Sequence, residues 1–427
     1  MTSAAEIGAA ALPSAVAGRE KWVLVVSLGL VFFVLFALFA AILGVLLPNQ
    51  IQDIDPIGKT ATLGIVFAIT SVFSTTTTPV SGALSDRTRS RFGRRTPWIV
   101  AGSLVGGIAT ILIPHGGNIF GITAFWLLAT VGLNCMLPPI TTVVADRFRP
   151  SERGMVSGVV GATMTAGLSA GTIFGGLLAA HMFLAYAILG GGVILACALF
   201  VVLNPEPPLS ATLVAPPPFR LGAFLRGFWI SPREHPDFAW AFFGRFSIYM
   251  GYQAVLTYLL YILEDHIGLS QADANATIAR LSSVTLVALV VSSLLSGWLA
   301  DRLGRLKPLV FLAGLIMAMA VVAPLVSRNI PGMFGYAVLI GLGYGAFMSV
   351  DLALMTRVLP ARPEGEEATG KDLGILTTAI NIPQILSPAL AAVLLNLTGN
   401  NYPLLFCLAA IFVVAGAAFV LPIRSVR

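Results

Sequence analysis

Long apolar runs separated by short polar loops dominate this chain of 427 residues. A helix needs about 20 mostly apolar residues to cross a bilayer. The runs are continuous, whereas strands of a membrane barrel alternate apolar and polar residues over about 10 positions. We therefore predict an all-α membrane protein with twelve transmembrane helices. The predicted spans are 22–47, 60–83, 98–113, 119–144, 155–180, 183–203, 238–263, 276–300, 308–326, 333–358, 373–397 and 402–421.

The charge content supports a membrane protein over a soluble one. Only 10% of the residues are charged and 57% are hydrophobic, whereas soluble domains carry roughly 25% charged residues. The net charge of +6 resides in short loops, so it indicates membrane orientation and not nucleic-acid binding. The three cysteines lie inside apolar runs and show no disulfide or metal pattern. We expect no metal site and no enzymatic activity.

One polar segment, residues 82–98, sets the predicted orientation. It reads GALSDRTRSRFGRRTPW and holds five arginines beside a single acid, Asp86. Lys and Arg are retained in cytoplasmic loops, and nearly all the other basic residues fall on the same side in a twelve-helix topology. Only Lys59 and Arg328 fall clearly on the outer side, with Arg280 near it. Both termini are therefore predicted to be cytoplasmic, in a multi-pass protein of the plasma (inner) membrane.

A proline-rich stretch at 204–237 divides the chain into two similar halves. The predicted organisation is a tail (1–21), a six-helix bundle (22–203), a cytoplasmic linker (204–237), a second six-helix bundle (238–421) and a short tail (422–427). The pattern Gly-x-x-x-Asp-Arg follows the second helix of each half, at Gly82 and at Gly297. Such repeats predict a pseudo-symmetric pair of bundles, with a binding site between the halves near the midplane.

The two copies of this pattern resemble the loop signature of the major facilitator superfamily. Residues 85–98, SDRTRSRFGRRTPW, are similar to the variant in sucrose transporters and glycoside–pentoside–hexuronide cation symporters. The resemblance implies alternating access and proton-coupled uptake of a sugar or glycoside. It implies no cofactor beyond a coupling cation, here expected to be H⁺. The expected partners are a small-molecule substrate, predicted to be a sugar, and the lipid bilayer, with the protein acting as a monomer.

The arginine-rich loops are candidates for cytoplasmic gating. Asp86 lies where the second predicted helix ends, and it can pair with an arginine of its own loop or accept from a neighbouring helix N-terminus. Gly82 permits a neighbouring helix to approach. The alternative is that the arginines only orient the protein and contact lipid headgroups. Asp146 and Arg153, in the loop after the fourth span, are either gating residues or solvated. The predicted gating set is Gly82, Asp86, Arg87, Arg94, Arg95, Gly297, Asp301, Arg302, Arg305, Asp146 and Arg153.

Two ionisable residues fall inside predicted spans. A charge at membrane depth costs roughly 2.5–3.5 kcal/mol on insertion scales and is a functional candidate by default. Arg245 and Asp351 lie at similar depths, each about seven residues, or roughly 10 Å, from the cytoplasmic end of its span. The resemblance to the major facilitator superfamily implies that their two spans, 238–263 and 333–358, both line the central cavity. We therefore predict that the two residues pair, and that Asp351 binds a proton in one conformation and releases it in another. The alternative is a static pair that fixes helix packing.

Polar and aromatic residues at depth are candidates for substrate binding. Amide groups supply donors and acceptors and aromatic rings cover apolar faces, which suits a sugar. The alternative for each tyrosine is helix packing. The predicted substrate-binding residues are Tyr249, Tyr252, Gln253, Asn134, Asn381 and Gln384.

One motif favours export over uptake. The fifth span contains Gly167, Gly171, Gly175 and Gly176, resembling the glycine-rich motif of drug–proton antiporters, with Thr172 in place of the usual proline. Such glycines equally indicate close helix packing. Sugar symport is therefore the first prediction and proton-coupled export of a small molecule the second. A non-transporting sensor is the third.

Overall fold

The computed structural model describes residues 18–206, 235–358 and 370–424, and all their regular structure is helical. The predicted linker lies almost entirely outside these residues. The first part of the chain forms α1 (Gly18–Ala41), η1 (Ile42–Leu46), α2 (Leu47–Ile54), α3 (Lys59–Arg87), α4 (Thr96–Leu112), η2 (Ile113–His115), α5 (Ile119–Arg147), α6 (Pro150–Leu178), η3 (Ala179–His181) and α7 (Met182–Leu203). The later part forms α9 (Pro236–Thr257), α10 (Leu259–Tyr261), η4 (Ile262–His266), α11 (Gln271–Leu303), α12 (Lys307–Val326), α13 (Ile330–Val358), α14 (Gly370–Leu397) and α15 (Tyr402–Ala418).

These helices account for all twelve predicted spans. Within the described ranges, nine helical segments are long and apolar enough to cross a membrane, and one of them, residues 151–203, contains both α6 and α7. The pair α9 and α10–η4 forms a further span bent by 55°, and α15 is a shorter apolar helix. The all-helical membrane fold is confirmed.

Several helices extend past their apolar runs. The second span was expected to end at 83, but α3 continues to Arg87, so Asp86 lies on the last turn of a helix. Likewise α5 continues to Arg147 and α6 begins at Pro150, which places Asp146 and Arg153 on helices and not in a loop. Hydropathy marks where a helix leaves the lipid, whereas backbone hydrogen bonding continues into the polar interface.

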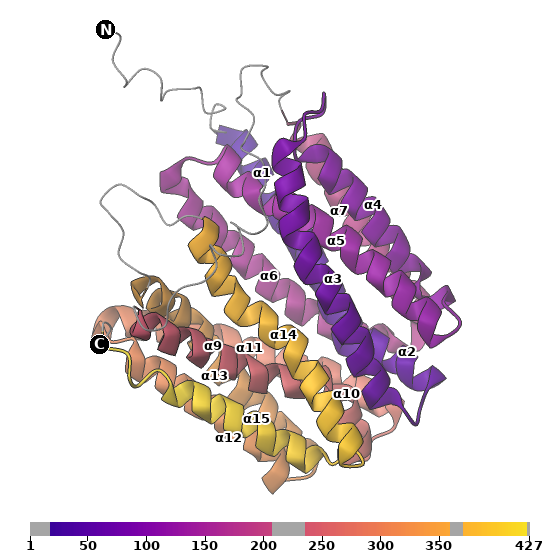
Figure 1. Ribbon diagram of the computed structural model, residues 1–427, viewed down its shortest axis with the longest axis vertical. Coiled ribbons are helices and arrows are strands. Elements are labelled where there is room, and N and C mark those ends of the chain that lie inside the picture. Colours follow the sequence, from indigo (N-terminus) through magenta and orange to yellow (C-terminus); the bar gives the residue numbers. More distant parts are fainter. Residues whose placement is uncertain (1–17, 207–234, 359–369, 425–427) are drawn as a thin grey trace. The chain divides into compact units, whose positions relative to one another are not determined.

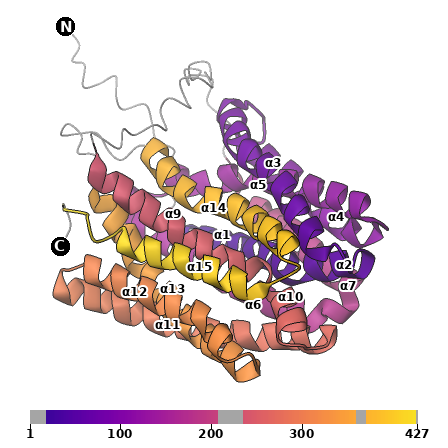
Figure 2. The same cartoon turned by 60° about the horizontal axis from the view of Figure 1, so that its bottom comes forward.

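The chain forms two compact units by its internal contacts. In the described parts, the first unit comprises 18–40, 73–171 and 181–206, and the second comprises 41–72, 172–180, 235–358 and 370–424. In the first unit α4 packs against α5 and α7 (Figure 1). In the second, α13 lies between α11 and α12, and α9 packs on α14 and α15 (Figure 2).

The glycines of α6 serve close packing, one of their two predicted roles. A Cβ atom at Gly167 would collide with the backbone of Phe33, and one at Gly171 with the backbone of Ala37, both on α1. Small residues at such spacing let helix backbones approach in membranes. This finding gives the motif a structural role that requires no substrate.

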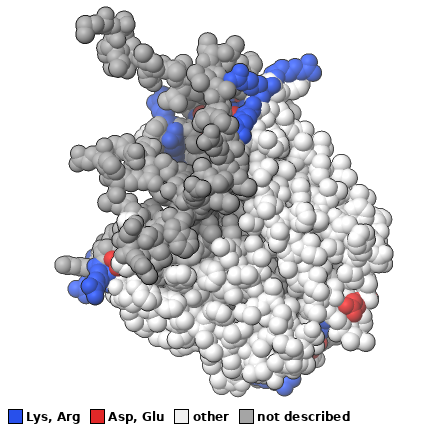
Figure 3. Space-filling model, viewed as in Figure 1, with Lys and Arg blue, Asp and Glu red and all other residues white. Residues whose placement is uncertain are grey.

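The visible face of the protein is largely uncharged. Figure 3 shows white side chains over most of that face, with Lys, Arg, Asp and Glu near its margins. Many large apolar side chains are exposed on the helices, among them Leu195, Val202, Leu294 and Ile411. Such a surface is unsuitable for water and matches contact with lipid chains.

Candidate functional site

Arg245 on α9 and Asp351 on α13 form a buried ion pair. Arg245 Nε lies 2.7 Å from Asp351 Oδ2, and the two side chains are 6% and 4% exposed. The atoms are close enough for an ion pair but are not aligned as a hydrogen bond. The predicted pairing is confirmed, whereas its role remains a prediction.

The pair begins a row of side-chain contacts between α9 and α13, which we call the ladder. It consists of Arg245, Tyr249 and Tyr252 on α9 and of Tyr344, Met348 and Asp351 on α13. Arg245, Tyr249 and Tyr252 are spaced i, i+4 and i+7, so they share one face of α9. Opposite them, Tyr249 Oη contacts Met348 Sδ at 3.1 Å and Tyr344 Oη at 3.3 Å. The Tyr252 and Tyr344 rings stack with centroids 4.5 Å apart and an interplanar angle of 7°.

The ladder adds two residues that sequence reasoning missed, Tyr344 and Met348. Tyr344, Met348 and Asp351 are spaced i, i+4 and i+7 along α13 and run antiparallel to the stripe on α9. The sequence contains this spacing, but its meaning depends on the contact between α9 and α13, which only the structure shows. Met348 is exposed, and Tyr252 and Tyr344 are partly exposed, so this face is not sealed by packing.

The other predicted substrate residues differ in their surroundings. Asn134, in the first unit, is buried and donates to the carbonyl of Thr130 on its own helix, while accepting from the Thr78 hydroxyl. Gln253 donates to Thr257 one turn along α9 at 3.3 Å. Asn381 and Gln384 on α14 are exposed. The structure therefore groups Tyr249 and Tyr252 with Tyr344 and gives Asn134 a helix-packing environment.

Arg95 organises the first arginine loop within the first unit. Its guanidinium contacts Asp86 Oδ1 at 2.5 Å and Asp146 Oδ2 at 3.2 Å, and Arg94 reaches Asp146 Oδ1 at 2.8 Å. The predicted pairing of Asp86 with an arginine of its own loop is confirmed. Arg153 donates instead to the backbone carbonyls of Phe148 and Ala145, and Arg87 is exposed.

Glu206, which follows α7 in the sequence, contacts this loop, and the sequence did not reveal the contact. Its Oε2 accepts from the backbone N–H groups of Arg95 and Thr96, at 2.8 and 3.1 Å. These groups begin α4, where a carboxylate satisfies free N–H donors and favours the helix dipole. Gly93 has φ of +89° and faces Glu206 so closely that a side chain there would collide.

The second copy of the pattern has a different environment. A Cβ at Gly297 would meet Ser349 Oγ of α13 at 3.0 Å, whereas one at Gly82 would meet Pro138 at an ordinary 3.4 Å. Close approach therefore requires glycine more at Gly297 than at Gly82, where we had predicted it. Arg302 lies over the Trp298 ring at 5.2 Å, and Arg305 is exposed. The side chain of Asp301 lies outside the described part.

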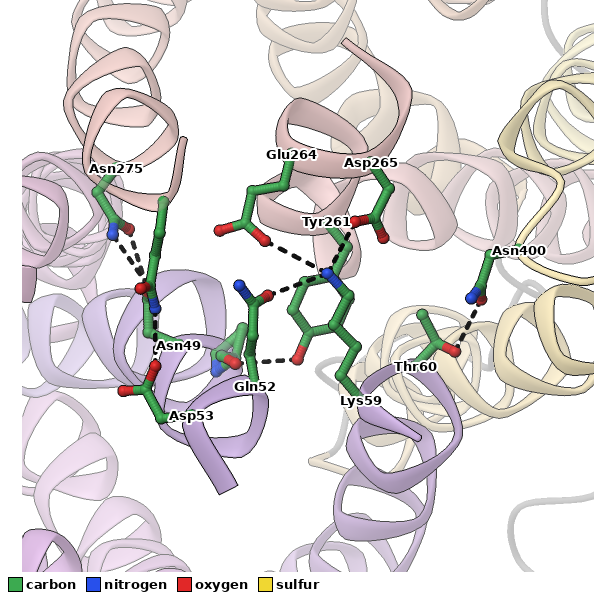
Figure 4. Close-up of polar contacts among 12 residues, drawn as sticks. Asn49, Gln52, Asp53, Lys59, Thr60, Tyr261, Glu264, Asp265, Asn275 and Asn400 are labelled. Atoms are coloured by element: carbon green, nitrogen blue, oxygen red, sulfur yellow. Dashed lines mark hydrogen bonds and ion pairs between the residues drawn. The ribbon is translucent and has the colours of Figure 1, made fainter. Parts of the chain in front are cut away.

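A third polar group, which we call the lysine cluster, comprises Lys59, Gln52, Tyr261, Glu264 and Asp265 (Figure 4). Lys59 Nζ lies 2.9 Å from Asp265 Oδ1, 3.3 Å from Glu264 Oε2 and 3.1 Å from Gln52 Oε1. It also lies 4.7 Å from the Tyr261 ring centroid. Glu264 and Asp265 directly follow the predicted span 238–263, a position where solvated side chains are expected. Lys59 and Glu264 are instead only 9% and 7% exposed.

The described residues contain no group of three or more His, Cys, Asp or Glu side chains placed to hold a metal ion. The ionisable side chains instead occur in pairs and clusters of opposite charge. Such pairing is how buried charges are tolerated at membrane depth.

The nine helical segments of the described residues that are long and apolar enough to cross a membrane define a multi-pass membrane protein. Comparison with known proteins identifies the family, because the family model described as Major Facilitator Superfamily matches residues 28–366 and 241–427. The chain therefore belongs to the major facilitator superfamily. The twelve-helix, two-bundle fold class and a transport function, as opposed to an enzymatic one, follow from that membership.

Characterised relatives are similar over different lengths. A di-/tripeptide transporter of Lactococcus lactis subsp. cremoris is 31% identical over 172 residues, which are 40% of this chain and 33% of that protein. The chain thus matches about a third of that relative's length. Multidrug resistance protein 2 of Bacillus subtilis is 24% identical over 389 residues, 88% of this chain and 91% of that protein.

Solved structures show the same fold. A bacterial homologue of the human lysosomal transporter Spinster, crystallised in an inward-facing and occupied conformation, superposes with a TM-score of 0.67. The match covers 95% of this chain and 97% of that chain at 14% identity. At this identity the likeness concerns the fold and not the substrate.

Proposed function

We propose that this transporter works by alternating access and couples substrate movement to H⁺, with Asp351 as the proton-binding group. The observation that carries the proposal is the buried Arg245–Asp351 pair. Ionisable residues at membrane depth are costly and mark proton and substrate pathways. When the two side chains separate, a carboxylate left without its counter-ion in an apolar environment becomes neutral by binding a proton.

We further propose that Tyr252 and Tyr344 contact the substrate. Their stacked rings lie on the same ladder as Asp351, and both are partly exposed. An aromatic surface with hydroxyl groups nearby suits an uncharged small molecule that has an apolar face. The Tyr249 hydroxyl contacts both Tyr344 and Met348, and Tyr249 lies one helical turn from Arg245 along α9.

Two substrate classes remain candidates. Uptake of a sugar or glycoside is supported by the resemblance of residues 85–98 to sugar–cation symporters. Export of a drug-like molecule is supported by the match to Multidrug resistance protein 2 over most of both chains. The helix packing found at Gly167 and Gly171 weakens the glycine motif as an argument for export, because packing alone accounts for it.

The remaining features of the proposal follow from the charge pattern of the sequence. We propose a monomer in the plasma (inner) membrane, with the arginine loop and both termini in the cytoplasm. No cofactor other than the coupling proton is required by this mechanism.

Transport in proteoliposomes tests the proposal after a ligand is found by thermal shift. A ligand at a hundredfold excess over its Kd stabilises the folded state by about 2.7 kcal/mol, so sugars and lipophilic drugs are screened on the purified protein with and without sodium. We expect Asp351→Asn to abolish accumulation driven by a pH gradient while retaining ligand binding and exchange at equal concentrations. The matched control is Asp273→Asn, an exposed acid at the start of α11.

The outcomes separate the two roles of the pair. Proton-driven accumulation that survives Asp351→Asn would refute the coupling role and leave a static pair.

The direction of proton movement separates uptake from export. Alkalinisation outside the vesicles during sugar entry supports symport. Proton movement opposite to a drug supports export.

A further inference from the structure

The lysine cluster lies where segments far apart in sequence meet. Gln52 belongs to α2 and Lys59 begins α3, whereas Tyr261, Glu264 and Asp265 belong to α10 and η4. All of them fall within the second compact unit. Since 22–203 and 238–421 are the predicted halves of the transporter, the cluster joins the first half to the second at the ends predicted to face outward.

Local structure on both sides places these side chains. Asp55 accepts from the Gly58 N–H at 2.9 Å and from the Thr62 hydroxyl at 2.7 Å, which fixes the turn that presents Lys59. On the other side, α9 ends at Thr257 and the chain bends by 55° before η4, a π-helical turn. Turns of this kind are rare and recur at functional sites.

Neutral hydrogen bonds surround the charges. Asn49 and Asn275 exchange amide hydrogen bonds at 2.8 and 2.9 Å, and Tyr261 donates to the carbonyl of Pro48 at 2.9 Å (Figure 4). Tyr258 donates to the carbonyl of Thr60, which also begins α3. Each bond links a residue of 48–60 to the second half of the chain.

We propose that the lysine cluster is a latch that holds residues 47–60 against η4 and α11, and that Lys59 is its essential charge. The proposal rests on the alternating-access function above, in which contacts that join the two halves at one end open during the cycle. Here they are closed, so this structure represents the latched state.

The charge arrangement makes the two acids redundant and the lysine unique. Lys59 is the one cation in contact with Glu264 and Asp265 among the described ion pairs, and both acids reach it. Asp265 has a second partner in the Tyr402 hydroxyl at 2.7 Å. Removal of one acid leaves a one-to-one pair. Removal of Lys59 leaves two adjacent carboxylates, which repel each other.

Accessibility of a buried cysteine tests the latch without requiring a substrate. Ala279 on α11 is 5% exposed, and its backbone and Cβ lie against Gly176 of α6, one turn from Asn275. Ala279→Cys is introduced after the three native cysteines are replaced by serine. Modification by a membrane-impermeant thiol reagent is then measured from the outer side of right-side-out vesicles.

We expect Lys59→Ala to raise the rate of modification at least about tenfold, since it shifts the population toward the open state. Glu264→Gln combined with Asp265→Asn should do the same, whereas each single change should raise the rate less than about threefold. Lys59→Arg should restore slow modification. The matched control is Arg328→Ala, which removes a cation whose Nε donates to the His266 carbonyl, outside the cluster.

An unchanged rate in both Lys59→Ala and the double-acid variant would overturn the latch. So would an equal rise with Arg328→Ala, which would indicate general loosening. Because the double-acid variant retains Lys59, it remains informative if Lys59→Ala fails to fold. The assay is independent of proton coupling, so a latch can be established even if Asp351 proves to be structural.

Discussion

The Arg245–Asp351 pair and the lysine cluster are both buried and ionic, but they are built differently. Among the described ion pairs, the Arg245–Asp351 pair joins one cation to one anion, with the two charged groups 2.7 Å apart. The lysine cluster surrounds one cation with two carboxylates, an amide and an aromatic ring. Neutral amide and tyrosine hydrogen bonds continue outward from it.

This difference indicates different tasks. Separation of a pair that consists of one described cation and one described anion changes the charge state of the site, which suits a proton switch. A cluster with several acceptors tolerates the loss of one, which suits a contact that holds position. Each of the following predictions tests this contrast.

The largest loss of stability is expected at the Arg245–Asp351 pair. Arg245→Ala leaves the Asp351 carboxylate buried without its counter-ion, and removal of one partner from a buried pair typically costs about 3–5 kcal/mol. The Arg245→Ala/Asp351→Ala double variant should recover much of this loss, because no uncompensated charge remains. Thermal unfolding in detergent measures both. A double variant no more stable than Arg245→Ala would show that packing, and not charge, dominates.

An intermediate effect is expected at the reciprocal amide pair. Asn275→Ala removes both hydrogen bonds with Asn49, which is buried, and an unsatisfied buried polar group costs about 1–3 kcal/mol. Asn49 retains its bond to the Val45 carbonyl and accepts from Gln271, so the cost should fall at the lower end. Unfolding transitions measure it. Ser283→Ala provides a baseline on the same helix, because Ser283 is exposed and its hydroxyl donates to the Ala279 carbonyl one turn earlier. An equal loss there would argue against a special role for Asn275.

The smallest effect is expected for one acid of the lysine cluster. Asp265 is 33% exposed, and Asp265→Asn should destabilise by no more than about 1 kcal/mol, since exposed ion pairs contribute little. The same unfolding assay applies, at low and high salt. A loss as large as that of Arg245→Ala would remove the contrast between the two regions.

Much of the fold followed from the sequence, but the helix ends did not. Apolar runs located the twelve spans. Opposite charges at equal predicted depth, together with the family resemblance, identified Arg245 and Asp351 as partners. The same reasoning placed Asp146 and Arg153 in a loop, where α5 and α6 in fact continue. Hydropathy reports the lipid boundary, and no apolar signal marks the last turns of a helix in the polar interface.

Residues whose roles depend on distant neighbours were missed or misread. Nothing in the sequence near Glu206 indicates that it accepts from the start of α4, more than a hundred residues earlier. The sequence placed Lys59 on the outer side but gave no sign that it contacts Glu264 and Asp265, some 200 residues later. Tyr344 lacked a partner until α9 and α13 were seen to face each other.

The sequence by itself determined that this chain is a helical membrane protein of the major facilitator type, with a charged pair at depth. Those conclusions depend on hydrophobic length, charge distribution and local motifs, which are properties of contiguous segments. The tertiary structure decided which charges meet: Arg95 with Asp86 and Asp146, and Lys59 with Glu264 and Asp265. The physical reason is that an ion pair depends on distances of a few ångströms between side chains, and helix packing alone sets those distances.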